Sequence, residues 1–224
     1  GGTASIEHAT FRHGRESVTN KNDAYHGDYA PGTATVTDSL LSSPAAFAKP
    51  PTGNIAVTLR RNTFAVKGSE IGSGLGAPLY LDGIDPTGVI LQGTDANQFG
   101  ASSTSRAVRV AGLDLSSNRT WTISSTSGAV IRTGASGGGS TPGIIVGNSG
   151  ALTIESGSII KGDGAAAIDV ASGGTLRVAG TTTNPVIFTS LRDDTIGGDT
   201  GNDGPTTPGT PSGVGITFAR TTSL

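Results

Sequence analysis

Apolar and polar residues alternate along many short stretches of this chain, and residues that favour turns separate the stretches. Examples are the segments 33–37, 54–59 and 106–110, each only a few residues long. Alternation over so few positions is typical of β-strands, in which successive side chains point to opposite faces. The 3.6-residue periodicity of an amphipathic helix is hard to find anywhere in the chain. The pattern therefore predicts an all-β protein whose short strands are joined by sharp corners of Gly, Ser, Asn and Pro.

The strands of the second half recur at a regular spacing. The sequence GALTI at positions 150–154 is echoed by GTLRV at positions 174–178, which is 24 residues later. This is a plausible length for one coil of a solenoid, and the predicted inward positions are almost all Val, Ile, Leu or Ala, as in stacked identical faces. An antiparallel sandwich also has short strands at such spacing, but the echo and the inward positions favour the solenoid. We therefore predict parallel stacking, with Ile154 and Val178 pointing into one narrow apolar core.

The second half also carries a recognisable family pattern. The segments that carry it are Asn118–Ile123, Ala151–Lys161, Gly173–Gly180, Asn184–Ser190 and Asp193–Asp199. Together they resemble right-handed parallel β-helix segments of large bacterial cell-surface proteins, within the pectate-lyase-like superfamily. The resemblance is clearest over residues 118–218 and 1–14, and residues 15–117 fit as looser coils with longer excursions. It implies one right-handed parallel β-helix domain over residues 1–224, with corner loops rich in Gly, Asn and Asp, and it says little about function.

Composition and charge narrow the classes of protein that fit. Gly accounts for 36 of the 224 residues, aromatic residues for 4% and charged residues for 14%. A compact helical protein normally carries more charge than this, and the steady recurrence of Val, Ile and Leu argues against disorder. The formal net charge of −2 gives no reason to expect nucleic acid or an anionic membrane as a partner, and no apolar run approaches the roughly 20 residues of a membrane span. The chain has neither Cys nor Met, so we expect a fold without disulfides in a processed or excised piece of a longer product.

The richest polar cluster of the sequence lies in a glycine-rich segment near position 200. Its carboxylates are Asp193, Asp194, Asp199 and Asp203. Because Ca²⁺ is a hard cation that takes six to eight oxygen ligands, this cluster predicts a structural Ca²⁺ site. It is no EF-hand, because loop position three, Gly201, lacks an oxygen-bearing side chain and loop position twelve lacks the bidentate Glu. The alternative is a solvated turn in which the Asp side chains cap backbone amides.

A catalytic constellation is not recognisable in the sequence. A glycosidase needs two carboxylates that face each other across the scissile bond, and none of the four glutamates stands in such an arrangement: Glu7, Glu16, Glu70 and Glu155. A β-helix lyase would need an Arg or Lys base beside a carboxylate cluster. Residues of the right type are Arg60, Arg61, Lys67, Arg106 and Arg109, but nothing in the sequence places them beside carboxylates. We therefore predict a scaffold with no enzymatic activity.

The three histidines all lie near the N-terminus. A strand would place His8 and His13, which are five positions apart, on opposite faces. This argues against a metal ion shared by the two residues. We expect a hydrogen-bonded strand histidine instead.

The two ends of the chain carry two halves of one pattern. In the family pattern, the acidic loop leads into a Gly-Ile-x-Phe strand and then into a strand of the Ile-Glu-His-Ala-Thr-Phe-Arg type. Here GITF begins at Gly215, whereas IEHATFR begins at Ile6. Open solenoid ends expose unpaired backbone donors and acceptors, and neither end shows the polar cap that natural solenoids carry. The predicted self-assembly ends are Ile6, Phe11, Ile216 and Phe218.

These interpretations predict a secreted or cell-surface structural protein. The chain would be a subunit or repeat of an extracellular filament or surface fibre whose partner is itself, in a head-to-tail homopolymer. The alternative is a stalk or passenger segment of a surface adhesin, with surface glycans as ligands. A polysaccharide lyase or hydrolase is the third reading, and no nucleic-acid partner or membrane insertion is expected.

Overall fold

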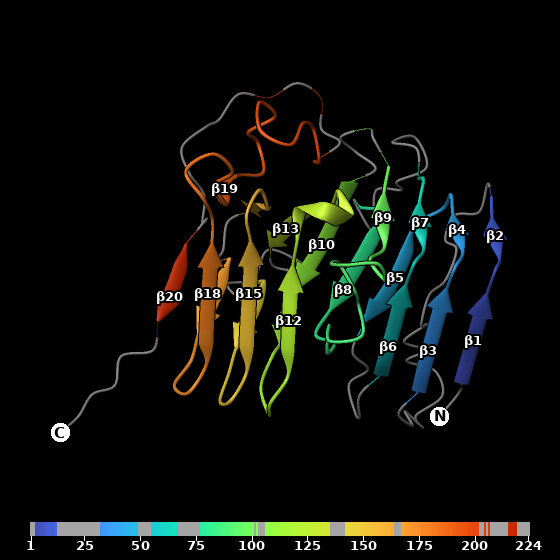
Figure 1. Cartoon of the computed structure of the whole chain (residues 1–224), viewed down its shortest axis with the longest axis horizontal. Helices are drawn as coiled ribbons and strands as arrows, with labels where there is room; N and C mark the ends of the chain where they lie inside the picture. Colours follow the sequence, from blue (N-terminus) through green and yellow to red (C-terminus); the bar gives the residue numbers. More distant parts are fainter. Residues whose placement is uncertain are drawn as a thin grey trace.

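A computed structural model describes residues 3–12, 32–48, 55–66, 77–100, 102, 106–134, 142–163, 167–201, 204, 206 and 215–218. Nearly all the regular structure in these residues is short β-strand, and every strand pairing is parallel. Successive strands along the chain belong to different sheets, so the chain winds in coils about one axis. The fold is a right-handed parallel β-helix, as the sequence predicts (Figure 1).

The front face of the helix in Figure 1 is built from two three-stranded sheets. The first consists of β1 (Thr3–Glu7), β3 (Gly32–Thr37) and β6 (Ile55–Arg60). The second consists of β12 (Thr120–Ile123), β15 (Ala151–Glu155) and β18 (Thr175–Ala179). Residues 85–89 lie between the two sheets, because Val89 forms a parallel bridge with Leu59 while its carbonyl accepts a 2.9 Å hydrogen bond from Trp121 Nε1.

Three further sheets complete the coils. The short sheet next to the front face consists of β2 (Thr10–Phe11), β4 (Leu40–Leu41), β7 (Thr63–Phe64) and β9 (Gln98–Phe99). A six-stranded sheet runs along both halves of the helix and consists of β5 (Ala45–Ala48), β8 (Leu79–Asp82), β10 (Ala107–Ala111), β13 (Val130–Gly134), β16 (Ile159–Asp163) and β19 (Ile187–Ser190). The last consists of β11 (Leu113–Asp114), β14 (Ile144–Val146), β17 (Ile168–Val170) and β20 (Ile216–Phe218). The 3-10 helix η3 (Ser125–Ser127) follows β12 at a corner.

Strand register confirms the 24-residue echo of the sequence. Leu152 pairs with Leu176, and Ile154 pairs with Val178, in parallel register. Ile154 is fully buried, and Val178 continues its inward column as predicted, but Val178 is 44% exposed. The reason is its position: β18 is the edge strand of its sheet, and no further described coil covers it. The described part of residues 15–117, expected as looser coils, also stacks in register: β3 pairs residue by residue with β6 and with β1 of the segment 1–14.

A column of polar side chains is buried at the corner that follows the first front sheet. Asn62 and Asn97 are fully buried, and Asn62 Nδ2 donates to Asn97 Oδ1 at 2.9 Å and to the Val36 carbonyl at 2.8 Å. Asn62 Oδ1 accepts a hydrogen bond from the backbone N–H of Ser39 at 3.1 Å. The column therefore supplies hydrogen bonds to backbone groups that the tight corner removes from the sheets.

The corners of the second half rely on glycine. A Cβ at Gly150 would collide with the Leu115 carbonyl, and a Cβ at Gly174 would collide with the Val146 carbonyl. These two glycines occupy equivalent places immediately before β15 and β18. The close approach of consecutive coils explains why glycine opens both segments of the echo.

Candidate functional site

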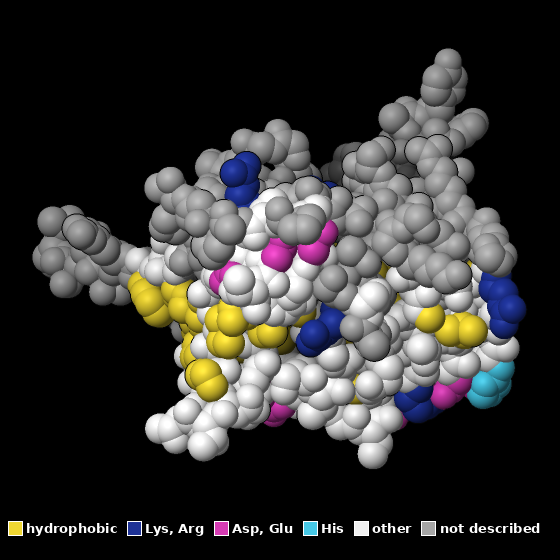
Figure 2. Space-filling model, turned by 90° about the horizontal axis from the view of Figure 1, so that it is seen from above, with side chains coloured by type: hydrophobic (Ala, Val, Ile, Leu, Met, Phe, Trp, Pro, Cys, Tyr) yellow, Lys and Arg dark blue, Asp and Glu magenta, His cyan; other side chains and the backbone are white. Residues whose placement is uncertain are grey.

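The coil that ends the helix on the C-terminal side exposes apolar side chains. Val178 is 44% and Phe218 is 66% exposed, and they are the two exposed large hydrophobic residues of the described chain. Phe218 pairs with Val170, which is buried, so Phe218 occupies an inward column that this coil leaves uncovered. Figure 2 shows hydrophobic side chains gathered at this end of the molecule. Ile216, also predicted as an assembly residue, is partly buried against the core.

The coil at the other end holds the remaining two predicted assembly residues. Ile6 pairs with the buried Val36, and Phe11 pairs with the buried Leu41. Both are partly buried against the core, so both continue inward columns on the outermost described coil. All four predicted residues thus lie on the two terminal coils of the stack, and their role in assembly stays a prediction.

The described carboxylates of the predicted Ca²⁺ site are engaged in turn hydrogen bonds. Asp193 accepts a hydrogen bond from Thr189 Oγ1 at 2.6 Å and one from the Thr195 backbone N–H at 3.2 Å. These hydrogen bonds from Thr189 and Thr195 lower the pKa of Asp193 below its ordinary value. Asp194 Oδ2 accepts from the Thr206 backbone N–H at 2.7 Å.

Asp199 Oδ2 accepts from the Gly204 backbone N–H at 3.1 Å, and Asp203 lies outside the described residues. In the part of the chain that the structure describes, Asp193, Asp194 and Asp199 do not form a group whose ligand atoms all lie within 4.8 Å of one another. Their hydrogen bonds match the turn-capping alternative. The Ca²⁺ site stays a prediction.

A buried lysine, which the sequence analysis did not single out, holds the loop that carries Asp193, Asp194 and Asp199. Lys161 projects from β16, is fully buried, and donates from Nζ to the carbonyls of Asp193 at 2.8 Å and Gly198 at 2.6 Å. Burial lowers the pKa of Lys161, while the neighbouring carboxylates, Asp194 foremost, act in the opposite direction. The acidic loop therefore already surrounds one positive charge that the chain itself supplies.

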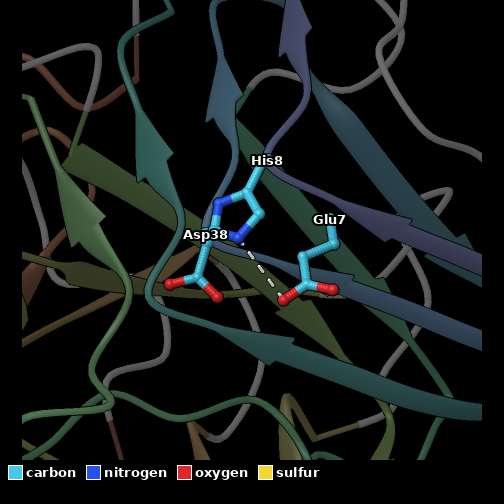
Figure 3. Close-up of side chains that lie close together, drawn as sticks. All are labelled: Glu7, His8 and Asp38. Carbon is cyan, nitrogen blue, oxygen red and sulfur yellow. Dashed lines mark ion pairs between the residues drawn. The ribbon is translucent and has the colours of Figure 1, made fainter.

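A second group of possible metal ligands lies at the corner after β1. Glu7, His8 and Asp38 place one ligand atom each within 4.8 Å of the others, and His8 Nε2 lies 3.5 Å from Glu7 Oε1 (Figure 3). Arg61 donates to both Asp38 oxygens, from Nε at 2.6 Å and from Nη2 at 2.7 Å. This hydrogen bonding with Arg61 lowers the pKa of Asp38 below its ordinary value.

The expectation of a strand histidine is wrong for His8. The residue follows the last residue of β1 and adopts the left-handed conformation, with a φ of 51°. Its side chain is exposed and faces Glu7. The corner, which the alternation pattern did not locate, therefore gives His8 its orientation. His13 lies outside the described residues.

The candidate catalytic bases that the structure describes have structural partners. Arg60 Nη1 lies 3.8 Å from Asp95 Oδ2, and Arg61 is held by Asp38 and Asp95. Arg106 Nε donates to the Gly128 carbonyl at 2.8 Å, and the Arg109 guanidinium lies 5.0 Å from the centre of the Tyr80 ring. Lys67, Glu16 and Glu70 lie outside the described residues.

Taken with this geometry, comparison with known proteins places the chain in a class. It is a parallel β-helix, and residues 140–202 match the family model described as the pectate-lyase-like β-helix domain. The resemblance to the pectate-lyase-like superfamily predicted from the sequence is thereby confirmed. Searches among curated proteins and among solved structures gave no significant match. Within the described residues, no helix has the length and apolar character needed to cross a bilayer.

Proposed function

We propose that this β-helix is a structural unit of an extracellular filament or surface fibre, in which copies stack head to tail through their terminal coils. The observation that carries the proposal is the exposure of Val178 and Phe218 at positions that are buried in every preceding described coil of their columns. Water contact at two such side chains is unfavourable, and covering each would contribute roughly 1.5–3 kcal/mol if burial is complete.

Unpaired strand edges support the same arrangement. Within the described residues, β1 and β18 are the outermost strands of the front face and each pairs with a single neighbour. The exposed N–H and C=O groups of such an edge are a template for another strand. A second copy offers a parallel strand of the same face, because β1 and β18 lie at opposite ends of one stack (Figure 1).

The corners define the register of this stacking. Ile6 and Val178 are each the last inward residue before the corner that ends a front strand, as their partners Val36 and Ile154 are in the preceding coils. Aligning these corners pairs Ile6 with Val178 and places Ala4 opposite Leu176. The outward side chain of Arg177 then lies diagonal to Glu7 of the next copy, so opposite charges approach one another.

The contact is heterologous, because a C-terminal coil meets an N-terminal coil. Repetition of a heterologous contact gives an open filament unless the rotation between copies closes a ring. A fibre of this kind suits a secreted or surface location. A stalk segment of a surface adhesin, the alternative, would use the same coils as one stretch of a longer solenoid and would not polymerise.

Assembly is tested by sedimentation velocity over a range of concentrations, with electron microscopy of the largest species. The wild-type chain should form concentration-dependent oligomers, and Val178→Asp and Phe218→Asp should remain monomeric. The matched control is Thr175→Asp, because Thr175 is exposed on the outward side of the same strand as Val178. This variant should assemble like the wild type. A wild-type chain that stays monomeric at every concentration would overturn the proposal and favour the stalk.

A further inference from the structure

We propose that Glu7, His8 and Asp38 form a binding site for a divalent transition-metal ion, with Zn²⁺ as the matching ion. Among the described His, Asp and Glu side chains, these three make the one group whose ligand atoms all lie within 4.8 Å of one another. One imidazole with two carboxylates is a donor set that Zn²⁺ accepts, and the exposed side chains leave its fourth position open to water.

The stacking of coils brings the ligands together. Glu7 is the last residue of β1 and pairs with Thr37, so His8 and Asp38 are the next residues of two adjacent coils. The backbone N–H of His8 donates to the Thr37 carbonyl at 3.3 Å, which extends the pairing into the corner. Both corner residues have a φ of 51°. The two side chains therefore leave adjacent coils with the same φ, and Figure 3 shows them directed to the same side of the corner.

The separation of the donor atoms fits one ion. With bonds of about 2.0–2.1 Å, tetrahedral geometry places neighbouring ligand atoms about 3.4 Å apart. His8 Nε2 and Glu7 Oε1 are 3.5 Å apart. The third donor, on Asp38, lies within the 4.8 Å limit, and a small rotation of the exposed Glu7 and His8 side chains would bring both onto the same ion.

Asp38 is oriented as metal-binding carboxylates usually are. Ligating carboxylates commonly accept hydrogen bonds from an outer residue, which fixes their direction. Here Arg61 makes two hydrogen bonds to Asp38, and its Nη1 donates to Asp95 Oδ1 at 2.8 Å. Arg60 also lies beside Asp95, and the three carboxylates of Glu7, Asp38 and Asp95 outnumber the two guanidinium groups, so the net formal charge of these side chains is negative and favours a cation. Each Asp38 oxygen retains a second lone pair for the ion.

Titration of the chelator-treated full chain with Zn²⁺ alone, followed by calorimetry, tests this site. The wild-type chain should bind about one equivalent, and His8→Asn and Glu7→Gln should each weaken binding at least tenfold, as loss of one ligand requires. Asn suits position 8 because it tolerates the left-handed conformation. The matched control is Glu155→Gln, because Glu155 occupies the corresponding place after Ile154 but is followed by Ser156. This variant should bind like the wild type.

A thermal readout separates binding at this site from adventitious binding. Zn²⁺ should raise the Tm of the wild type and of Glu155→Gln but not that of His8→Asn, because an ion bound to the folded state stabilises it by mass action. Circular dichroism checks that each variant is folded. If His8→Asn does not fold, the exposed and conservative Glu7→Gln decides the question. The proposal would be overturned if the wild type showed no saturable Zn²⁺ binding or if Glu7→Gln bound Zn²⁺ as tightly as the wild type. It would also be overturned if Glu155→Gln lost as much Zn²⁺ affinity as Glu7→Gln.

Discussion

The buried Nζ of Lys161 lies 2.8 Å from the carbonyl oxygen of Asp193, although Lys161 belongs to β16 and Asp193 to the loop after β19. A second hydrogen bond reaches the Gly198 carbonyl at 2.6 Å. One side chain thus fixes two points of a loop that carries three described carboxylates. The loop is attached to the six-stranded sheet through this ammonium group.

Replacing Lys161 by Met should destabilise the protein. Met fills a similar volume, but it leaves the buried Asp193 carbonyl without its donor, at about 1–3 kcal/mol, and it also removes the partly buried hydrogen bond to the Gly198 carbonyl. Urea unfolding measures the change. Arg192→Met is the control, because Arg192 is an exposed cation of the same loop, and it should change the free energy of unfolding little. Equal effects of the two substitutions would contradict the role of Lys161.

Acidification should lower the free energy of unfolding, because part of it depends on the ionised carboxylate of Asp193. The folded-state pKa of Asp193 lies below its ordinary value of 3.8 because Thr189 and Thr195 donate hydrogen bonds to the carboxylate. The unfolded chain therefore binds more protons in this range, so the contribution is fully present above pH 3.8 and is lost as pH falls through the folded-state pKa. Urea unfolding at several pH values should show a steeper acid loss for the wild type than for Asp193→Asn. If the free energy of unfolding falls with pH in the same way for the two proteins, Asp193 is not the source of the acid loss.

The predicted Ca²⁺ site and the turn-capping alternative differ in their response to a chelator. If the carboxylates around Asp199 hold Ca²⁺, EGTA should lower the Tm and added Ca²⁺ should restore it, because the ion binds the folded state. Asp199→Asn should then abolish the response. An unchanged Tm would leave the carboxylates as caps of backbone N–H groups. In that case the Lys161 ammonium is the cation of the loop.

Truncation of the buried asparagine column should cost more than truncation of its exposed neighbour. Asn62→Ala removes hydrogen bonds to the Val36 carbonyl, to Asn97 and to the Ser39 N–H, all inside the helix. Each buried group left unsatisfied costs about 1–3 kcal/mol. Thr63→Ala, next in the chain and exposed, is the control for urea unfolding. Similar losses for the two variants would show that water replaces the column at little cost.

The local features of the sequence predicted the fold, because alternation and the echo between 152 and 176 depend on neighbouring residues. The sites depend on which residues of consecutive coils pair, and the number of residues between paired positions varies along the chain. Thr3 pairs with Thr33, whereas Ile168 pairs with Ile216 across a much longer excursion. No fixed period therefore points from His8 to Asp38, or from Lys161 to Asp193. Left-handed φ at His8 and Asp38 would have marked the corner, but neither residue requires that conformation.

The last prediction tests the register of the proposed filament through charge. If Ile6 of one copy lies against Val178 of the next, exposed Arg177 and Glu7 approach diagonally, and such a pair contributes roughly 0.2–1 kcal/mol. Arg177→Glu and Glu7→Arg should each weaken assembly in sedimentation experiments, and the double variant should recover it. The assays contain EDTA, so that loss of a metal ligand at Glu7 does not enter, and high salt should reduce the differences because it screens exposed charges. A double variant that assembles no better than the two single variants would exclude this register, while the Val178→Asp result would still decide whether the ends stack.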